Sequence, residues 1–402
     1  MRWVDDQYLQ RLYRALASQG QFLRYNRMQL RRVLFIFGTR PEAIKLCPLL
    51  LKLRSFPELY STQVCVTGQH RGMLDQVLAA FGVTPDYDLN VMTPGQTLFR
   101  STARIIQALE QPFAASKPDL AVVQGDTTTT LCGALAAFYS GVPVAHVEAG
   151  LRTGDLHQPF PEELNRVLTA RMTRLHFAAT KAAADNLRRE GISEHVWITG
   201  NTGIDAVLHV RDRLERGELT ASASDFERPG KRLILVTAHR RESFGEGFRR
   251  ICQALAEIAG RNDVHVVYPV HPNPNVQTIV NERLRSHPNI TLTEPMDYVP
   301  FVDLMRRAHL ILTDSGGIQE EAPSLGKPVL VLREKTERPE AVEAGTVKLV
   351  GTDTGRIVRE TVNLLDCQDE YERMSRIHNP YGDGHASERI EAAIRDDLKI
   401  AR

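Results

Sequence analysis

Cysteine is scarce in this sequence, and no two cysteines have the spacing of a CxxC pair. The five residues are scattered and odd in number: Cys47, Cys65, Cys132, Cys252 and Cys367. This usage argues against a disulfide framework and against a zinc site. We therefore expect a protein of the reducing cytoplasm.

The sequence also lacks an excess of charge of either sign, and it lacks long apolar runs. Its 50 Lys and Arg residues balance 49 Asp and Glu residues, which leaves a formal net charge of +1. This balance argues against a nucleic-acid partner. No apolar run reaches membrane-spanning length and the N-terminus has no apolar signal core, so we expect no membrane association.

Two common phosphate-binding motifs are missing as well. The first strong apolar run, residues 33–37, leads into GTRPEAIK (38–45), which is neither GxGxxG nor a P-loop. Dinucleotide binding and ATP hydrolysis therefore lose their main support, and we expect neither a cofactor nor a metal. Arg40 and Lys45 bring positive charge to the start of a predicted helix. Arg40 is either a solvated loop charge or a contact to an anionic ligand.

A chain of 402 residues is long enough for two domains. Short apolar runs alternate with helical segments about seven times up to residue 200, which predicts an α/β domain with a doubly wound parallel sheet. After a charged stretch at 211–231 the pattern restarts, with strands predicted at 232–237, 264–270, 310–313 and 328–332. The second half is therefore another Rossmann-like sheet. Residues 1–30 form a predicted helical extension with no assigned chemistry.

The stretch from residue 122 to 166 places carboxylates at the carboxyl ends of two predicted strands. Asp126 follows one strand, Glu148 follows the next, and the pair Glu162 and Glu163 opens a later helix. Ligands of open α/β sheets bind at that edge. An acid at a strand end is also a common helix cap, so for Asp126 the cap and a catalytic role stay equally open. Glu162 and Glu163, taken alone, fit a helix start better.

In the second half the predicted strand ends carry cations and glycines. Ser315, Gly316 and Gly317 precede a helix predicted from residue 318, and such a turn suits either an anion or an ordinary helix start. Glu320 and Glu321 lie one turn further on, where a carboxylate could hold ribose hydroxyls. His239, in the segment HRRE, suits a diphosphate, although a structural histidine is the alternative.

Many separate segments together resemble the non-hydrolysing UDP-N-acetylglucosamine 2-epimerase family. They span almost everything after residue 31, in one order: GTRPEAIK (38–45), TGQHRGMLDQ (67–76), QGDTTTT (124–130), HVEAGLRTGD (146–155), PFPEELNR (159–166), TAHRRESFG (237–245), PVHPNP (269–274), DSGGIQEEAPSLGKPVL (314–330) and ERPEAV (337–342). The resemblance implies a GT-B fold, with two Rossmann-like domains and the active site between them. It implies one domain of residues 31–200 plus about 380–402, closed by a C-terminal helix at 387–399, and a UDP-binding domain of residues 201–379.

The resemblance also implies roles for individual residues. It assigns acid/base chemistry to the three carboxylates Asp126, Glu148 and Glu162, and a place near the leaving diphosphate to His239. It assigns binding of the nucleotide sugar to Arg40, Lys45, His271, Phe301, Ser315, Gly316, Gly317, Glu321 and Arg338. The implied partners are UDP-N-acetylglucosamine and UDP, and a second copy of the chain in a homodimer.

The implied reaction is epimerisation at C2 by elimination of UDP and its re-addition. Alternatives remain open at this point: an epimerase for a related UDP-acetamido sugar, a GT-B glycosyltransferase, or a regulator that only binds a nucleotide sugar. A glycosyltransferase would share the nucleotide site but needs an acceptor groove rather than three acids. A regulator would not need Asp126 or Glu148.

Overall fold

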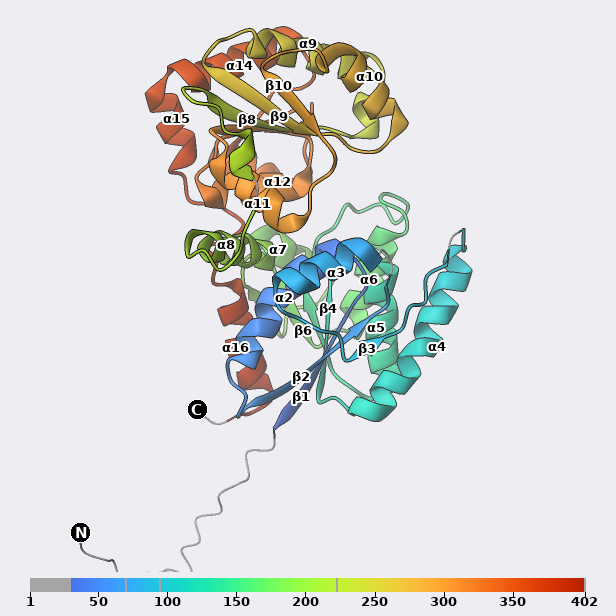
Figure 1. The fold of residues 1–402 in the computed structure, drawn as a ribbon. Coiled ribbons are helices and arrows are strands. Elements are labelled where there is room, and N and C mark those ends of the chain that lie inside the picture. The colour runs from blue at the N-terminus through green and yellow to red at the C-terminus, as the bar shows by residue number, and fades with distance from the viewer. Residues whose placement is uncertain (1–29, 69–70, 94, 222, 401–402) are drawn as a thin grey trace, which may run out of the picture.

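The computed structural model describes residues 30–400, apart from residues 69–70, 94 and 222. The helix expected within residues 1–30 therefore lies outside the described residues. The chain forms two α/β domains, each built on one parallel sheet, of seven and six strands. The two domains stack end to end, with helix α8 (Thr202–Glu215) between them (Figure 1).

The first sheet has the strand order β3-β2-β1-β4-β5-β6-β7, and the chain reverses its winding direction between β1 and β4. All its pairings are parallel. The strands are β1 (Arg31–Phe37), β2 (Tyr60–Val66), β3 (Tyr87–Asp88), β4 (Leu120–Gln124), β5 (Val144–Val147), β6 (Leu175–Ala178) and β7 (Val196–Ile198). The helices are α2 (Arg40–Arg54), α3 (Arg71–Ala80), α4 (Leu98–Ser116), α5 (Thr128–Tyr139), α6 (Glu162–Met172) and α7 (Lys181–Arg189). The doubly wound parallel sheet predicted for this half is confirmed.

The second sheet has the order β10-β9-β8-β11-β12-β13, again parallel, with its reversal between β8 and β11. Its strands are β8 (Arg232–Thr237), β9 (Val264–Pro269), β10 (Ile290–Thr293), β11 (Leu310–Thr313), β12 (Val329–Val331) and β13 (Val347–Leu349). The sequence predicted four of these. It missed β10 and β13, which are edge strands and only partly buried, so they lack a continuous apolar run.

The helices of this half are α9 (Glu246–Ala259), α10 (Pro274–Leu284), α11 (Tyr298–Arg307), α12 (Gly316–Glu321), α13 (Pro339–Ala344), α14 (Thr354–Asp366) and α15 (Gln368–Ser375), with short 3₁₀ turns η1 (Ala223–Phe226), η2 (Arg241–Ser243) and η3 (Ala322–Leu325). Helix α12 starts at Gly316, two residues before the predicted start.

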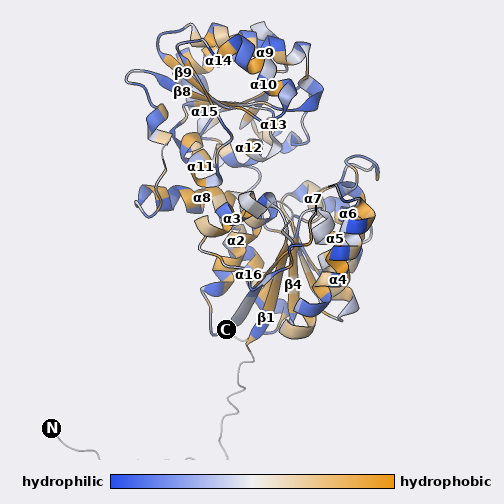
Figure 2. Cartoon of the chain, turned by 45° about the vertical axis from the view of Figure 1, so that its right-hand side comes forward, coloured by the Kyte–Doolittle hydropathy of each residue, from blue (hydrophilic) through white to orange (hydrophobic). Residues whose placement is uncertain are grey.

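Apolar strands form the centre of each domain, while the helices around them carry both polar and apolar residues (Figure 2). Phe35 and Phe37 of β1 are fully buried, as are Leu235 of β8 and Leu312 of β11. Each such side chain contributes roughly 1.5–3 kcal/mol through its removal from water. No helix among the described residues is long and apolar enough to cross a membrane. All five cysteines are free, and four of them are buried.

The chain crosses between the two domains twice, and the two crossings lie side by side. Asn201 N donates to the carbonyl of Tyr381 at 2.7 Å. Gly200, with φ of 89°, sits so close that a side chain there would meet the Tyr381 carbonyl and the Gly382 Cα. After the second crossing, α16 (Ala386–Asp397) packs on α2 of the first domain.

The start of α16 is held by α8. The carboxylate of Asp205 accepts from Ser387 N at 2.7 Å and from Ala386 N at 3.3 Å, and so caps α16 from another helix. Because α8 itself runs to Glu215, the first part of the charged stretch at 211–231, after which the sequence pattern restarts, is helical.

Candidate active site

A cavity of about 520 Å³ opens at the carboxyl ends of β1, β4 and β5. This is where the first sheet reverses its winding, the usual ligand position in an open α/β sheet. Three carboxylates singled out from the sequence, Asp126, Glu148 and Glu162, all line it. Lys45 lines it too, and Pro41, Leu98, Leu151 and Pro161 form an apolar part of the wall.

Glu148 is held in a fixed position by its backbone and by two partners. Its φ of 64° is left-handed, an arrangement that costs a non-glycine residue about 1–3 kcal/mol and is concentrated at functional sites. Its Oε2 accepts from Lys45 Nζ at 2.5 Å and from the Gln124 side chain. Burial acts to raise the pKa of Glu148, but the charges of Lys45 and Arg338 outweigh it and keep the pKa below its ordinary value.

Asp126 is held by Arg166, whose Nη2 lies 2.6 Å from Asp126 Oδ2. Burial raises the pKa of Asp126 even though Arg166 lowers it, and the charge of Glu148 adds to the increase. Helix α5 is capped by Thr127, which accepts from Thr130 N at 3.1 Å, so Asp126 does not serve as the helix cap. The cavity therefore contains two carboxylates whose pKa values are shifted in opposite directions, as acid/base sites require.

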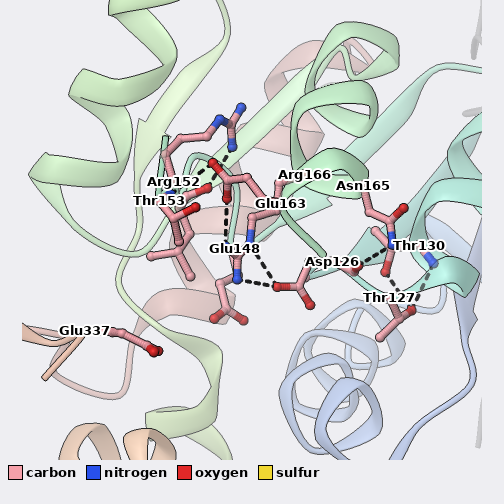
Figure 3. A network of polar contacts seen from close by, with 12 residues as sticks. Asp126, Thr127, Thr130, Glu148, Arg152, Thr153, Glu163, Asn165, Arg166 and Glu337 are labelled. Carbon is pink, nitrogen blue, oxygen red and sulfur yellow. Dashed lines mark hydrogen bonds and ion pairs between the residues drawn. The ribbon is translucent and has the colours of Figure 1, made fainter. Parts of the chain in front are cut away.

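The neighbouring acids Glu162 and Glu163 have separate surroundings. Glu163 is buried and accepts from Thr153 N at 2.9 Å, from Gly154 N at 3.1 Å and from Arg166 Nη1 at 2.9 Å. Figure 3 shows Arg166 lying between Glu163 and Asp126. Glu162 lines the cavity and, among the described residues, has no hydrogen-bond partner. No side chain caps α6, so neither glutamate is its cap.

Glu42 joins the two loops that form the cavity, a role that the sequence analysis did not identify. It is buried and accepts from Gly38 N at 3.0 Å and Thr39 N at 2.7 Å in one loop, and from Thr127 Oγ1 at 2.7 Å and Thr130 Oγ1 at 3.2 Å in the other. The spacing of Thr39 and Glu42 is that of a capping box, which could have indicated part of this role.

In the second domain, His239 lies at the end of β8 and stacks on the ring of His271 at 5.0 Å between centroids. Buried Asp314, at the end of β11, accepts from His239 N at 2.6 Å and Arg240 N at 2.7 Å, and its Oδ1 lies 3.4 Å from His239 Nδ1. Burial lowers the pKa of His239, although Asp314 opposes this. Asp314 was missed because a buried carboxylate that holds backbone N–H groups has no distinct sequence signal.

Arg338 connects the second domain to the carboxylates of the first. It pairs with buried Glu320, which also accepts from Asn201 Nδ2 at 2.5 Å. Burial acts to lower the pKa of Arg338, but the charges of Glu320 and Glu148 together raise it. A side chain at Gly316 would lie 3.8 Å from the Arg338 guanidinium, so the turn at residues 315–317 lies directly beside this cation.

Glu321 differs from Glu320 in having no hydrogen-bond partner among the described residues. Burial and the neighbouring charge of Glu320 raise the pKa of Glu321 to about 8, while Lys45 and Arg40 of the first domain act to lower it. Arg40 therefore lies on the side that faces the second domain rather than among the cavity-lining residues. Phe301 is on α11, partly buried against the core and outside the cavity.

The sequence-predicted residues thus form two groups. Lys45, Asp126, Glu148 and Glu162 share the cavity of the first domain. His239, His271, the turn at residues 315–317, Glu321 and Arg338 lie at the carboxyl edge of the second sheet. Within the described ranges, no group of three or more His, Cys, Asp and Glu side chains is arranged to hold a metal ion.

Known proteins resemble this chain over nearly its whole length. A family model described as UDP-N-acetylglucosamine 2-epimerase matches residues 53–395. The UDP-N-acetylglucosamine 2-epimerase of Salmonella typhimurium LT2 is 58% identical over 370 residues, covering 90% of this chain and 98% of the relative. The crystal structure of UDP-GlcNAc 2-epimerase from Neisseria meningitidis bound to UDP-GlcNAc has a TM-score of 0.82 at 48% identity, covering 91% of this chain and all of that one. The enzyme of Methanocaldococcus jannaschii in complex with UDP-GlcNAc and UDP has a TM-score of 0.73 at 34% identity, covering 91% and 99%.

Proposed function

The chain belongs to the UDP-N-acetylglucosamine 2-epimerase family, and we propose that it is an isomerase that interconverts UDP-N-acetylglucosamine and UDP-N-acetylmannosamine. The observation that carries the proposal is the group of three carboxylates, Asp126, Glu148 and Glu162, around one cavity of about 520 Å³. Arg338 brings positive charge from the second domain to the same place.

The chemistry explains why several acids are needed. The hydrogen on C2 of the sugar is not adjacent to a carbonyl, so a carboxylate alone cannot remove it at a useful rate. When the C1–O bond breaks and UDP leaves, positive charge develops at C1 and the C2 hydrogen becomes acidic. Loss of that proton forms a C1=C2 double bond, giving a 2-acetamidoglucal. Protonation of the other face of C2 and re-addition of UDP to C1 gives the epimer.

The different environments of the carboxylates suggest different roles. Glu148, kept ionised by Lys45, supplies a fixed negative charge that stabilises the positive charge at C1. Asp126, whose pKa is raised, and Glu162, which has no partner among the described residues, carry the protons at C2. Glu163 orients Arg166, and Arg166 in turn fixes the carboxylate of Asp126.

The second domain holds UDP in this proposal. The diphosphate is bound by Arg338, His239 and the backbone of the turn at residues 315–317. Hydrogen bonds to the charged diphosphate are stronger than hydrogen bonds between neutral groups. Glu321 accepts from the ribose hydroxyls, His271 supports His239 by stacking, and Phe301 lies beside the uracil. Arg40 and Lys45 contact the nucleotide sugar from the first domain.

The proposal divides the chain into two domains. The acid/base domain consists of residues 31–200 and about 380–402, and the UDP-binding domain consists of residues 201–379. The packing of α16 on α2 supports this division.

The direct test is to incubate the protein with UDP-N-acetylglucosamine in heavy water. The manno product should carry deuterium at C2, because a carboxylate that has taken the proton exchanges it with solvent before the return step. Asp126→Asn, Glu148→Gln and Glu162→Gln should abolish most of this exchange. A product without deuterium would contradict the elimination mechanism.

The same incubation separates two of the alternatives, and a parallel incubation with a related UDP-acetamido sugar tests the third. A glycosyltransferase would make no epimer without an acceptor, and a binding regulator would make none at all. An epimerase for a related UDP-acetamido sugar would turn over that sugar in preference to UDP-N-acetylglucosamine.

We also propose that the protein is a cytoplasmic homodimer. Large apolar side chains are exposed on α5 and α6 and the segment before α6: Phe138 (64% exposed), Tyr139 (71%), Phe160 (62%), Leu164 and Leu168. An exposed apolar surface of this kind favours self-association. Sedimentation velocity should show a dimer that Leu164→Lys combined with Leu168→Lys converts to monomers.

The cytoplasmic location is proposed from the cysteines. All five are free thiols, which favours a protein of the reducing cytoplasm.

A further inference from the structure

A second cavity, of about 600 Å³, lies on the far side of the second domain from the candidate active site. It opens at the amino ends of β8, β11 and β12, next to Leu233, His309 and Lys327. His239 stands at the other end of β8, and a strand of six residues spans about 20 Å. A ligand in this cavity would therefore not touch a substrate between the domains.

The lining of this cavity is strongly basic. It includes Arg228, Lys231, Arg232, Arg307 and Lys327, and its one acid is Glu227. Arg232 is paired with Asp263, and Arg307 lies 2.9 Å from Glu227 and 3.0 Å from Asp303. These pairs neutralise part of the lining and leave other cations in excess.

Lys327 is one of the cations left without an acidic partner among the described residues. It is partly buried, and among the described residues its ammonium group has neither an acidic partner nor a hydrogen-bond acceptor. Burial and the charge of Arg306 lower its pKa. A partly buried lysine without a counter-ion is costly, and an anion in the cavity would remove that cost.

His309 supplies a further polar atom without a partner among the described residues, its ring Nε2. Its ring stacks on Tyr371 at 4.3 Å between centroids with an angle of 14°. Its Nε2 is buried and has no hydrogen-bond partner among the described residues, a state that costs roughly 1–3 kcal/mol. Burial, with the charges of Arg232 and Lys327, lowers the pKa of His309 to about 4. Lys327 and His309 both line this cavity, so one ligand within it can contact both.

We propose that this cavity binds the phosphate group of a small molecule at a site separate from the active site. A doubly charged tetrahedral anion suits a cavity lined by several cations, among which Lys327 has no acidic partner among the described residues. The cavity volume lies within the range of small-molecule sites, and Leu233, Pro229 and Tyr371 provide apolar surface for the organic part of a phosphate ester.

The test is calorimetric titration of inorganic phosphate into the full chain, with UDP present at a concentration that fills one site per chain. We expect one further phosphate per chain, with acetate at equal ionic strength failing to replace it. Lys327→Gln should weaken phosphate binding by about tenfold or more, the size expected for loss of one charge-assisted contact. Lys181→Gln on α7 removes the same charge from an exposed site and should leave phosphate binding unchanged.

Two results would overturn the proposal: no further phosphate uptake, or equal uptake by Lys327→Gln and the unchanged protein, which would indicate an adventitious ion only. Thermal melting and UDP binding establish that the variant is folded. Should Lys327→Gln fail to fold, Lys231→Gln, on the rim of the same cavity, is subject to the same criteria.

Discussion

Replacing Lys45 by Met should change the pH dependence of the reaction, because Lys45 is what keeps Glu148 ionised. The two groups are 2.5 Å apart, and both side chains are more than four-fifths removed from solvent. Methionine keeps the length of the side chain while removing its charge. Glu148 would retain its burial, which raises its pKa, and would lose the largest influence that lowers it.

The size of the effect follows from the geometry. An opposite charge within a few ångströms lowers a carboxyl pKa by about 1–3 units. At 1.36 kcal/mol per unit, Lys45 therefore stabilises the ionised form of Glu148 by about 1.4–4 kcal/mol. Its loss should raise the pKa of Glu148, because burial, which acts to raise that pKa, would then be opposed by the weaker influences of Arg338 and Arg166.

The assay is the pH profile of kcat for epimerisation at saturating UDP-N-acetylglucosamine, which reports groups in the enzyme–substrate complex. In the variant, activity should begin to fall at a higher pH than in the unchanged protein as the pH decreases, because Glu148 then takes up its proton at a higher pH. Lys181→Met, on the exposed face of α7, is the matched control and should leave the profile unchanged.

The reasoning fails if Lys45→Met lowers kcat equally at every pH. That result would mean that Lys45 binds the substrate without setting the charge of Glu148. An unchanged kcat at every pH would mean that Glu148 does not need its charge.

Further predictions concern the other site residues. Asp126→Asn and Glu162→Gln should each slow epimerisation by about a hundredfold or more, while UDP affinity, measured by calorimetry, stays nearly unchanged. His239→Ala and Arg338→Ala should weaken both turnover and UDP binding; wild-type kinetics in both would mean that the diphosphate lies elsewhere. Glu321→Gln should raise the melting temperature at about pH 8, because the raised pKa of Glu321 makes the folded protein lose stability as the pH rises above the unfolded value of 4.5. This gain should vanish at about pH 4, where Glu321 is protonated in both states. Small-angle scattering should report a more compact particle once UDP binds, as expected if the two domains close on it; equal radii of gyration would contradict this.

The sequence predicted those strands that are buried on both faces of their sheet. Strands buried on both faces, such as β1 and β4, are continuous apolar runs, and their carboxyl ends must meet at one edge. That rule alone was enough to predict that Asp126 and Glu148 lie together. It failed for β10 and β13, where polar residues at partly buried positions break the apolar run.

The details of the site depend on contacts that no local pattern encodes. Glu162 and Glu163 are adjacent in sequence, but successive residues on a helix point about 100° apart. One therefore lines the cavity while the other binds the backbone at Thr153 and Gly154. Similarly, Glu320 rather than Glu321 pairs with Arg338, a choice set by the tertiary position of Asn201 and Arg338.

The paired crossings at Gly200 and Tyr381 make the second domain a cassette inserted into the first. Its two ends meet at a single hydrogen bond of 2.7 Å between Asn201 N and the Tyr381 carbonyl. An internal deletion that joins residue 200 to residue 382 would keep α16 but remove α8, which packs on α2 and whose Asp205 caps α16. Truncation at residue 380 would remove α16, which also packs on α2. Fragments of the first domain for crystallography or binding assays should accordingly retain both α8 and α16.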